Sequence, residues 1–297
     1  MNVVITGASG FVGQNLQPFL EEDGFEISPL SLRHNSQHEV SDHYDAIIHL
    51  AGKAHDTKNI SAPDQYFRVN TELTKQLFDR FLQSDARDFI YFSSVKAVAD
   101  QVAGHLVEDV EPNPQTPYGQ SKRQAEQYLN SQSLPAGKRL FILRPCMIHG
   151  PGNKGNLNLL YQVVSKGLPW PLTAFDNERS FLSIDNLNYI IKRILEDADI
   201  PGGTYNLADD DPLSTNELIG LIGQAREKKP SLWKIPRGIV SGIAKIGDTL
   251  HLPLNSERLK KLTESYVVRN SKIKSALKID KLPVSAREGL LKTLRSF

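Results

Sequence analysis

A tyrosine and a lysine four residues apart are the side chains of this chain that are best spaced for chemistry. Tyr118 and Lys122 would share one face of a helix, one turn apart. A tyrosine hydroxyl titrates at roughly pH 10 when unperturbed, and a neighbouring ammonium group together with the positive charge of an oxidised nicotinamide favours the phenolate. The pair therefore predicts a general acid or base, Tyr118, whose pKa is tuned by Lys122.

A glycine-rich turn at the start of the chain predicts the partner of this chemistry. Gly7, Gly10 and Gly13 follow the β-branched run Val3-Val4-Ile5 and precede apolar residues at helical spacing. In such a turn one glycine permits the tight bend, one lets a dinucleotide pyrophosphate approach the backbone, and one lets the helix pack closely on the strand. We expect the cofactor contacts of this turn to come from Gly7, Ser9, Gly10, Phe11, Val12 and Gly13.

Continuous apolar runs supply the elements that must position these residues. Such runs are typical of strands covered on both faces, and segments with helical periodicity at 64–84 and 120–130 separate them. The predicted further strands are residues 25–30, 46–50, 89–92 and 140–143. The alternation predicts an α/β fold with a Rossmann-type doubly wound parallel sheet, in which the short polar stretch 31–45 holds an abbreviated element.

The pattern changes beyond Pro145, where the chain becomes less regular and richer in proline and lysine. We expect a smaller, mostly helical substrate region at the carboxyl edge of the sheet, where open α/β sheets bind ligands. The predicted division assigns residues 1–150 to the NAD(P)-binding domain, with 180–205 returning to it, and residues 151–179 and 206–297 to the substrate region. The amphipathic stretch 232–250 has the pattern of a membrane-surface helix, but we interpret it as a helix of the substrate region.

Composition excludes several classes of protein. The 297 residues carry 35 Lys and Arg against 34 Asp and Glu, so the net charge of +1 gives no overall attraction to nucleic acid or to an anionic membrane. Cys146 is the only cysteine, which excludes an internal disulfide and a thiolate zinc cluster and fits a cytoplasmic setting. Five of the eight histidines lie between His34 and His55, but no acidic or cysteine pattern accompanies them, so we expect no metal site. No run is long enough for a membrane span, and no stable membrane insertion is expected.

Several short motifs, in order along the chain, resemble landmarks of the extended short-chain dehydrogenase/reductase family, which consists mostly of sugar-nucleotide epimerases, dehydratases and reductases. They are Thr6-Gly7-Ala8-Ser9-Gly10-Phe11-Val12-Gly13, His49-Leu50-Ala51-Gly52, Val69-Asn70, Phe92-Ser93-Ser94, Pro117-Tyr118-Gly119-Gln120-Ser121-Lys122, Arg144-Pro145 and Gly150-Pro151-Gly152. The resemblance implies that Lys122 also bonds the nicotinamide ribose and that the two long helices pair in a homodimer. It further implies a cofactor site lined by Leu50, Ala51, Gly52, Asn70 and Pro145.

The end of the second strand favours NADP over NAD as the cofactor. An acidic residue in this position commonly binds the ribose hydroxyls of NAD. Here Ser31 and Arg33 follow Leu30, no carboxylate repels a 2′-phosphate, and both side chains can bond one. NAD remains possible, because Arg33 can also be a solvated loop charge.

The resemblance assigns a hydroxyl partner of Tyr118 to the end of the fourth strand. Alignment of Ala97-Val98-Ala99 with the usual Val-Tyr-Gly selects Ser94 rather than Ser93. The dehydratases of the family have an Asp-Glu pair after this hydroxyl, where this chain has Val95-Lys96, so dehydration is not expected. The epimerase-reductases that make GDP-fucose use a cysteine near this strand end, whereas Cys146 lies elsewhere and is interpreted as a packed apolar residue.

The substrate side resembles the part of the family that binds a nucleoside diphosphate. Amide and guanidinium groups suit a diphosphate, and this assigns Asn156 and Arg179 to it, with Arg258 as a weaker second cation that can equally be a solvated helix charge. The run from Tyr118 to Asn186 is most similar to bacterial enzymes that act on UDP-linked N-acetylated 6-deoxyhexoses.

These features predict an enzyme that transfers hydride from NADPH to C4 of a 4-keto-6-deoxy sugar carried by UDP or dTDP. Tyr118, Ser94 and Lys122 would be the catalytic residues. A UDP-sugar 4-epimerase is the alternative, because the same residues can remove the hydride and return it to the opposite face. A dinucleotide sensor without activity is an alternative of another class, although such proteins typically lose the Tyr or the Lys and this chain has both.

Overall fold

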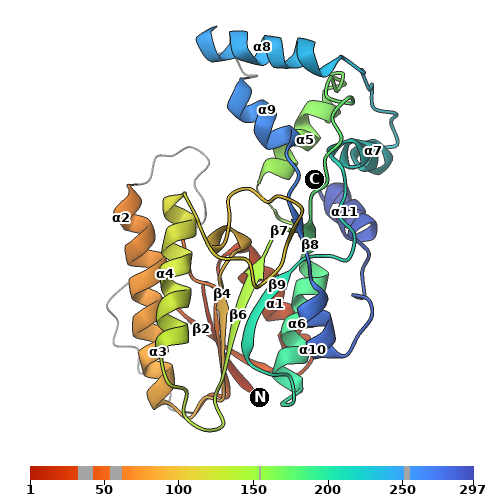
Figure 1. The fold of residues 1–297 in the computed structure, drawn as a ribbon. Coiled ribbons are helices and arrows are strands. Elements are labelled where there is room, and N and C mark those ends of the chain that lie inside the picture. The colour runs from red at the N-terminus through yellow and green to blue at the C-terminus, as the bar shows by residue number, and fades with distance from the viewer. Residues whose placement is uncertain (33–42, 54–61, 154, 251–254) are drawn as a thin grey trace.

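A sheet of six parallel strands organises the molecule (Figure 1). The structure is a computed structural model that describes residues 1–32, 43–53, 62–153, 155–250 and 255–297. The strands, in their order across the sheet, are β2 (Glu26–Leu30), β1 (Asn2–Thr6), β3 (Ala46–His49), β4 (Asp88–Phe92), β6 (Arg139–Pro145) and β9 (Gly203–Leu207). Chain order reverses between β1 and β3, and ligands of open parallel sheets bind outside the carboxyl ends of the strands at such a switch point.

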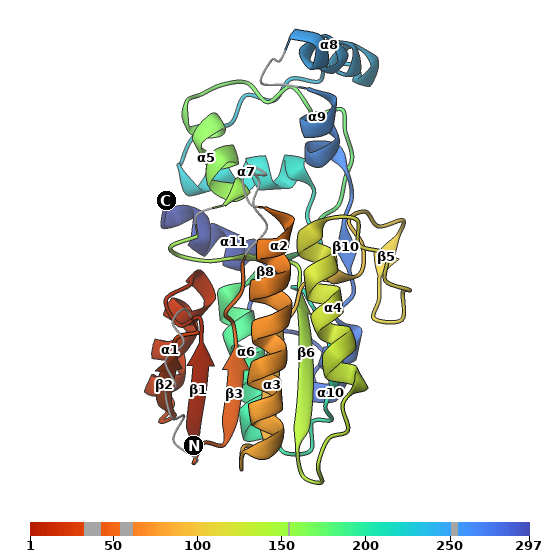
Figure 2. The same cartoon turned by 90° about the vertical axis from the view of Figure 1, so that its left-hand side faces the viewer.

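Helices cover both faces of this sheet (Figures 1 and 2). One face carries α1 (Phe11–Glu22), α6 (Ile184–Glu196) and α10 (Ser271–Leu277). The other carries α3 (Leu73–Gln83) and α4 (Pro117–Ser131), with α2 (Pro63–Tyr66) and the π-helix η1 (Phe67–Glu72) leading into α3. The fully buried strands explain the continuous apolar runs, because every side chain of β3 and β4 is covered.

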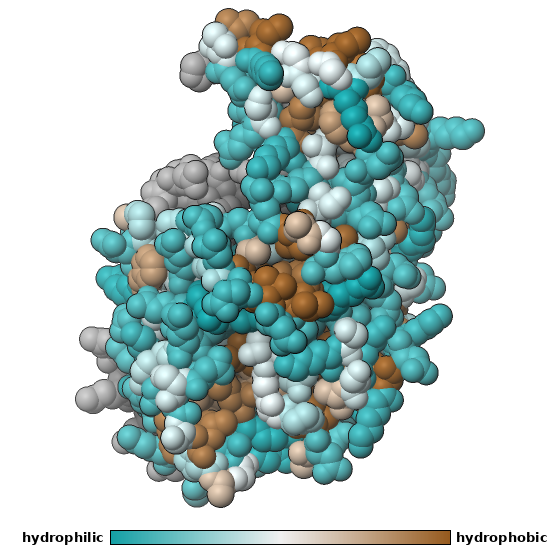
Figure 3. Space-filling model, viewed as in Figure 1, coloured by the Kyte–Doolittle hydropathy of each residue, from teal (hydrophilic) through white to brown (hydrophobic). Residues whose placement is uncertain are grey.

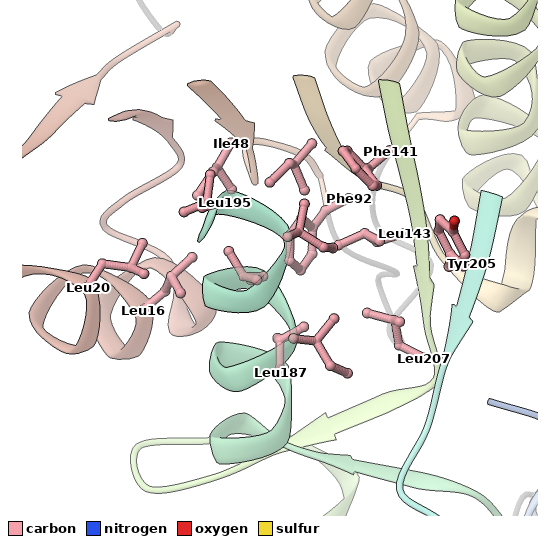
Figure 4. Packing of buried hydrophobic residues seen from close by; sticks show 14 of the residues in the cluster. Leu16, Leu20, Ile48, Phe92, Phe141, Leu143, Leu187, Leu195, Tyr205 and Leu207 are labelled. Carbon is pink, nitrogen blue, oxygen red and sulfur yellow. The ribbon is translucent and has the colours of Figure 1, made fainter. Parts of the chain in front are cut away.

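The larger core lies between the sheet and the α1–α6–α10 layer. Figure 4 shows Leu16 and Leu20 of α1 and Leu187 of α6 pointing into the same layer as Phe141 and Leu143 of β6. All five side chains are fully buried. This packing fixes the strands relative to one another. Residues at their carboxyl ends therefore keep the relative positions that a binding site requires.

A second, smaller core forms the other part of the molecule, above the carboxyl edge of the sheet (Figures 1 and 2). Its helices are α5 (Asn156–Ser165), α7 (Thr215–Ala225), α8 (Arg237–Leu250), α9 (Ser256–Thr263) and α11 (Ala286–Arg295). Two short parallel pairs, β7 (Met147–His149) with β8 (Phe181–Ser183) and β5 (His105–Leu106) with β10 (Val267–Val268), lie between the two parts, as does the 3-10 helix η2 (Val95–Ala97). We call this second part the upper lobe.

The predicted Rossmann-type sheet is confirmed, with local differences. The helix expected over 120–130 begins at Pro117, because the Thr116 side chain accepts a hydrogen bond from the Gly119 amide and caps it. The helix expected over 64–84 contains the π-helix, and the strand β9 was not predicted, because its Gly-Thr-Tyr-Asn-Leu sequence lacks an apolar run. The segment 232–250 is helical only from Arg237.

The division into domains stays a prediction, and the packing of α10 bears on it. Ile273 and Leu277 of α10 are buried in the core of the sheet, although the predicted boundary places them with the substrate region. Ile190 and Ile191 of α6 lie in the same core, within the segment that was expected to return to the sheet.

Candidate active site

The glycine turn joins β1 to α1 in a conformation that needs glycine. Gly7 has a φ of 72°, and a Cβ atom there would lie 2.6 Å from the Ala51 amide nitrogen. A Cβ on Gly13 would lie 2.5 Å from Ala8, so this glycine allows α1 to pack on its own turn. These contacts bring the turn against the residues that follow β3.

Gly10 differs from the other two glycines in a way that fits a bound dinucleotide. A Cβ on Gly10 would meet only the Gly7 carbonyl oxygen, at 3.2 Å, so close packing within the chain does not account for this glycine. Gly10 is also the N-cap of α1, and no side chain caps the helix there. The first amides of α1 and its positive dipole end are therefore suited to a pyrophosphate, as the residues of the turn predict.

A hydrogen-bonded histidine fixes the ends of β1 and β3 relative to α3. His49 Nδ1 lies 2.6 Å from Thr6 Oγ1, and His49 Nε2 lies 2.9 Å from Thr74 Oγ1. Burial, followed by the charge of Lys122, lowers the pKa of His49 to about 3, so the imidazole is neutral at physiological pH. Leu50, Ala51 and Gly52 leave the sheet directly beyond this anchor.

Asn70 lies on the π-helix η1, which packs against α4. Its amide nitrogen donates to Ser121 Oγ at 3.0 Å and to the Lys53 carbonyl oxygen at 3.1 Å, and its Oδ1 accepts from the Lys53 amide at 2.7 Å. π-Helical turns occur frequently at functional sites. A Cβ on Gly52 would lie 3.1 Å from Asn70 Oδ1 and 3.2 Å from Lys122 Nζ, so these groups meet at one place.

Ser94 is the serine whose side-chain hydrogen bonding acts on the pKa of Tyr118, and its choice over Ser93 stays a prediction. Tyr118 lies in the first turn of α4, and Ser94 directly follows β4 and caps η2 by accepting a hydrogen bond from the Lys96 amide at 3.2 Å. Burial raises the pKa of Tyr118, and the hydrogen bond from Ser94 partly opposes this. The phenol is therefore protonated at neutral pH.

This direction differs from the lowering that the sequence predicts for Tyr118. That expectation combined the charge of Lys122 with the charge of an oxidised nicotinamide. In the structure Lys122 Nζ donates to the Phe92 carbonyl oxygen at 2.7 Å and lies 4.9 Å from the Tyr91 ring centroid. Burial lowers the pKa of Lys122 itself to about 8, against the raising effect of Glu126. Within the protein alone, burial decides the pKa of Tyr118.

A buried ion pair sets the position of α4, and the sequence reasoning missed it. Glu126 accepts hydrogen bonds from Arg144 Nε at 2.9 Å and Nη2 at 2.7 Å, and from Ser93 Oγ at 2.6 Å. The pair ties α4 to the ends of β6 and β4, and removing one member of such a pair typically costs about 3–5 kcal/mol. Glu126 follows Lys122 and Tyr118 at intervals of four residues, so helical spacing places it on their face of α4, but its partner Arg144 lies on another element.

Lys96, in the place of a dehydratase acid, takes part in the local structure. Its Nζ donates to the Asp100 carbonyl oxygen at 2.8 Å and lies 4.4 Å from the Tyr266 ring centroid. Asp100 in turn accepts hydrogen bonds from the Gln115 amide at 2.7 Å and from Thr116. Lys96 therefore helps to anchor the segment that starts α4.

The predicted cofactor residues at the ends of β1, β3, β4 and β6 lie on one edge of the sheet. Pro145 ends β6, and Ser31 follows Leu30, whose register partner on β1 is Thr6, so Ser31 lies beside the start of the glycine turn. Arg33 lies outside the described residues. The roles of Ser31 and Arg33 in cofactor choice stay predictions.

The predicted substrate residues lie in the upper lobe or at its base. Asn156 begins α5. Arg179 exchanges backbone hydrogen bonds with Leu213 at 2.9 Å, and burial lowers the pKa of its guanidinium against the effect of Glu264. Arg258 is exposed in the first turn of α9, and Glu264 is the C-cap of that helix. Arg258 thus lies at the start of α9, and Arg179 interacts with the residue that ends this helix. The substrate roles of both arginines stay predictions.

Cys146 is packed among apolar residues of both neighbouring cores, and burial raises the pKa of its thiol.

Among the described residues, no three His, Cys, Asp or Glu side chains are grouped so as to hold a metal ion. Within the same residues, no helix is both long and apolar enough to cross a membrane.

Comparison with known proteins agrees with this geometry. The model of the NAD dependent epimerase/dehydratase family matches residues 3–208. UDP-glucose 4-epimerase of Vibrio cholerae is 29% identical over 258 residues, which are 79% of this chain and 78% of that protein. GDP-6-deoxy-D-mannose reductase of Pseudomonas aeruginosa is 26% identical over 251 residues, 78% of this chain and 82% of that protein. The solved structure of RMD from Pseudomonas aeruginosa complexed with NADPH superimposes with a TM-score of 0.73 at 21% identity and covers 99% of this chain and 98% of that one.

Proposed function

Because the chain belongs to the NAD dependent epimerase/dehydratase family, we propose that this NAD(P)-dependent enzyme reduces C4 of a UDP-linked 4-keto-6-deoxy-(N-acetyl)hexose. The catalytic residues in this proposal are Tyr118, Ser94 and Lys122. The observation that carries it is the placement of Ser94, directly after β4, next to a protonated Tyr118 in the first turn of α4, with Lys122 one turn further along that helix.

Tyr118 is the proton donor in this reaction. Reduction of a ketone places negative charge on its oxygen, and a neutral phenol within hydrogen-bond distance neutralises that charge by giving up its proton. The Ser94 hydroxyl donates a hydrogen bond to the same oxygen and thereby fixes the carbonyl beside Tyr118. Val95 and Lys96 provide no carboxylate for the elimination of water, which is consistent with reduction without dehydration.

The residues at the strand ends suit a bound dinucleotide. Gly10 and the first amides of α1 would hold the pyrophosphate, and Lys122 would hold the nicotinamide ribose. When bound, the nicotinamide supplies the hydride. Ser31 and Arg33 would hold a 2′-phosphate, which makes NADPH the proposed cofactor.

A 4-epimerase is the second candidate, supported by the similarity to the Vibrio cholerae enzyme. An epimerase must first remove a proton from a hydroxyl, so it needs the phenolate of Tyr118 before the phenol. Ser31 and Arg33 support reduction instead, since they suit the 2′-phosphate of an NADPH that exchanges between turnovers, whereas epimerases tend to hold NAD tightly.

An assay with NADPH and UDP-linked sugars separates the candidates. A reductase consumes one NADPH for each 4-keto sugar reduced. Sugar interconversion without net loss of NADPH supports the epimerase, and cofactor binding without turnover over a broad panel supports a dinucleotide sensor. We expect a UDP-linked 4-keto-6-deoxy sugar to be reduced faster than the corresponding dTDP or GDP sugar.

The role of Tyr118 is tested with a matched pair of variants on α4. Tyr118→Phe removes the proton donor, and we expect kcat to fall about 10²- to 10⁴-fold with the affinity for NADPH retained. Tyr128→Phe is the control, because the Tyr128 hydroxyl binds Asp79 on the neighbouring α3 and not Ser94. Full activity of Tyr118→Phe contradicts the mechanism in both its reductase and epimerase forms.

A further inference from the structure

Helix α8 has two apolar faces, and only one of them is used inside the molecule. Val240, Ala244 and Gly247 are buried, the first two of them in the core of the upper lobe. A second set of apolar side chains follows at helical spacing and is exposed to solvent: Ile239 at 56%, Ile243 at 46%, Ile246 at 57% and Leu250 at 63%. At 100° per residue these four residues form one stripe, which we call the α8 stripe.

The α8 stripe lies at the end of the molecule that is farthest from the amino ends of the sheet strands. Figure 3 shows hydrophobic residues gathered at this end, over the position that α8 occupies in Figure 1. Trp233 and Leu232, in the segment that leads into α8, are also exposed, at 55% and 47%. The backbone of Trp233 is held in place, because its amide donates to the Trp170 carbonyl oxygen at 2.8 Å.

Basic residues accompany these apolar side chains. Residues 232–250, which comprise the stripe and the segment leading into it, hold three Lys and Arg against one acidic residue. Lys234 and Lys245 are exposed, and Arg237, which pairs with Asp176 at 3.1 Å, remains 57% exposed. The segment that carries the α8 stripe is therefore net positive, and Lys234 and Lys245 are cations exposed within it.

We propose that the α8 stripe docks on an anionic lipid bilayer, with the helix lying in the plane of the interface. An exposed apolar helix face combined with lysine, arginine and tryptophan matches the chemistry of interfacial helices. Anionic headgroups neutralise Lys234, Arg237 and Lys245, and the apolar side chains reach the acyl boundary. A symmetric contact with a second copy would instead bring the same cations of both copies together, which is unfavourable.

The α8 stripe lies away from the elements that carry the candidate active site. Ser94 precedes η2 and Tyr118 lies in the first turn of α4, whereas α8 forms the outer end of the upper lobe (Figures 1 and 2). The α8 stripe would thus bring the enzyme to a membrane surface. It does not depend on the proposed reaction.

Vesicle flotation with the full chain tests the proposal. We expect the protein to float with vesicles of phosphatidylcholine containing phosphatidylglycerol, to bind pure phosphatidylcholine at least ten times more weakly, and to be released by high salt. The double variant Ile243→Asp/Ile246→Asp should lose at least 90% of the binding. Leu134→Asp is the matched control, because Leu134 is an exposed leucine outside the upper lobe and should bind like the wild type.

A second measurement reports on the surface itself. The chain has two tryptophans, of which Trp170 is 6% exposed and Trp233 is 55% exposed, so iodide quenching reports mainly on Trp233. Vesicles should protect Trp233 in the wild type and not in the double variant, whose melting temperature and NADPH affinity should match those of the wild type. Absence of binding to anionic vesicles, equal binding by the double variant, or self-association that the double variant abolishes each overturns the proposal.

Discussion

Two adjacent serines at the end of β4 have different partners. Ser93 donates to the buried carboxylate of Glu126 at 2.6 Å, whereas the Ser94 hydroxyl accepts from the Lys96 amide at 3.2 Å and acts on the pKa of Tyr118. Alternation along an extended strand sends neighbouring side chains to opposite sides, so one serine faces the packed layer under α4 and the other faces the site. The same residue type therefore has a structural role at one position and a proposed catalytic role at the next.

Alanine variants of the two serines should separate these roles. Ser94→Ala should lower kcat roughly 10²-fold, because one donor to the carbonyl oxygen is lost, with stability little changed. Ser93→Ala should keep kcat within about twofold and lower the free energy of unfolding by roughly 1–3 kcal/mol, since Glu126 loses a buried donor. Steady-state kinetics and urea unfolding measure both effects. A larger loss of kcat in Ser93→Ala than in Ser94→Ala contradicts the assignment.

At the scale of elements, the close approach of α4 to η2 positions Tyr118 beside Ser94. Gly119 makes this approach possible, because a Cβ there would lie 2.4 Å from the Lys96 carbonyl oxygen and 2.9 Å from Pro114 Cβ. The Thr116 cap, held by Asp100, fixes where α4 begins. The positions of the two catalytic hydroxyls thus depend on backbone packing next to them.

The close approach is tested by a pair of glycine variants. Gly119→Ala should force α4 away from η2, lower kcat more than tenfold and cost about 1–3 kcal/mol of stability. Gly220→Ala on α7 meets nothing within 4 Å and should instead stabilise the protein by about 0.5–1 kcal/mol with unchanged activity. Wild-type kinetics in Gly119→Ala would show that this contact does not position Tyr118.

His49 joins β3, β1 and α3, and its protonation should weaken that connection. Its folded pKa of about 3 lies below the ordinary value of 6.5, so between these values the unfolded chain binds a proton that the folded chain does not. The free energy of unfolding should therefore fall as pH falls through this window, by roughly 2–3 kcal/mol between pH 7 and pH 4.5 from this group, and should lose nothing from it above about pH 7.

The variant His49→Gln isolates this contribution, because glutamine can bond both threonines and does not titrate. Urea unfolding at pH 7.0, 5.5 and 4.5 should show the stability difference between wild type and variant shifting in favour of the variant as pH falls. A difference that stays constant with pH would mean that His49 does not titrate in the predicted window.

The local order of strands, turn and helices could be predicted because each signal lies within a short stretch of sequence. The apolar runs of β3 and β4, the glycine spacing before α1 and the Tyr118–Lys122 spacing all have this property. The ion pair of Glu126 with Arg144, the π-helix around Asn70 and the strand β9 depend on contacts between distant segments, and no single stretch encodes them. Burial raises the pKa of Tyr118 in the protein alone, and burial is a property of the folded molecule; the lowering expected with an oxidised nicotinamide bound stays a prediction.

At the scale of the whole molecule, the cofactor should stabilise the packed sheet through the turn at its carboxyl edge. A ligand at 100 times its Kd adds about 2.7 kcal/mol to the free energy of unfolding. For a chain of this size that corresponds to a rise in Tm of roughly 5–10 °C. NADPH should raise the Tm more than NADH at equal concentration, and Arg33→Ala should reduce the difference. An equal or larger shift with NADH contradicts the choice of NADP.

The central claim is that hydride passes from NADPH to C4 of the sugar while Tyr118 supplies the proton. The most direct measurement uses NADPH deuterated at both C4 positions of the nicotinamide, with a UDP-linked 4-keto-6-deoxy-N-acetylhexose as substrate. We expect one deuterium at C4 of the product and one NADP⁺ per product molecule, with the rate of both reduced about 10²- to 10⁴-fold in Tyr118→Phe. A product without deuterium, or sugar interconversion without consumption of NADPH, would contradict it.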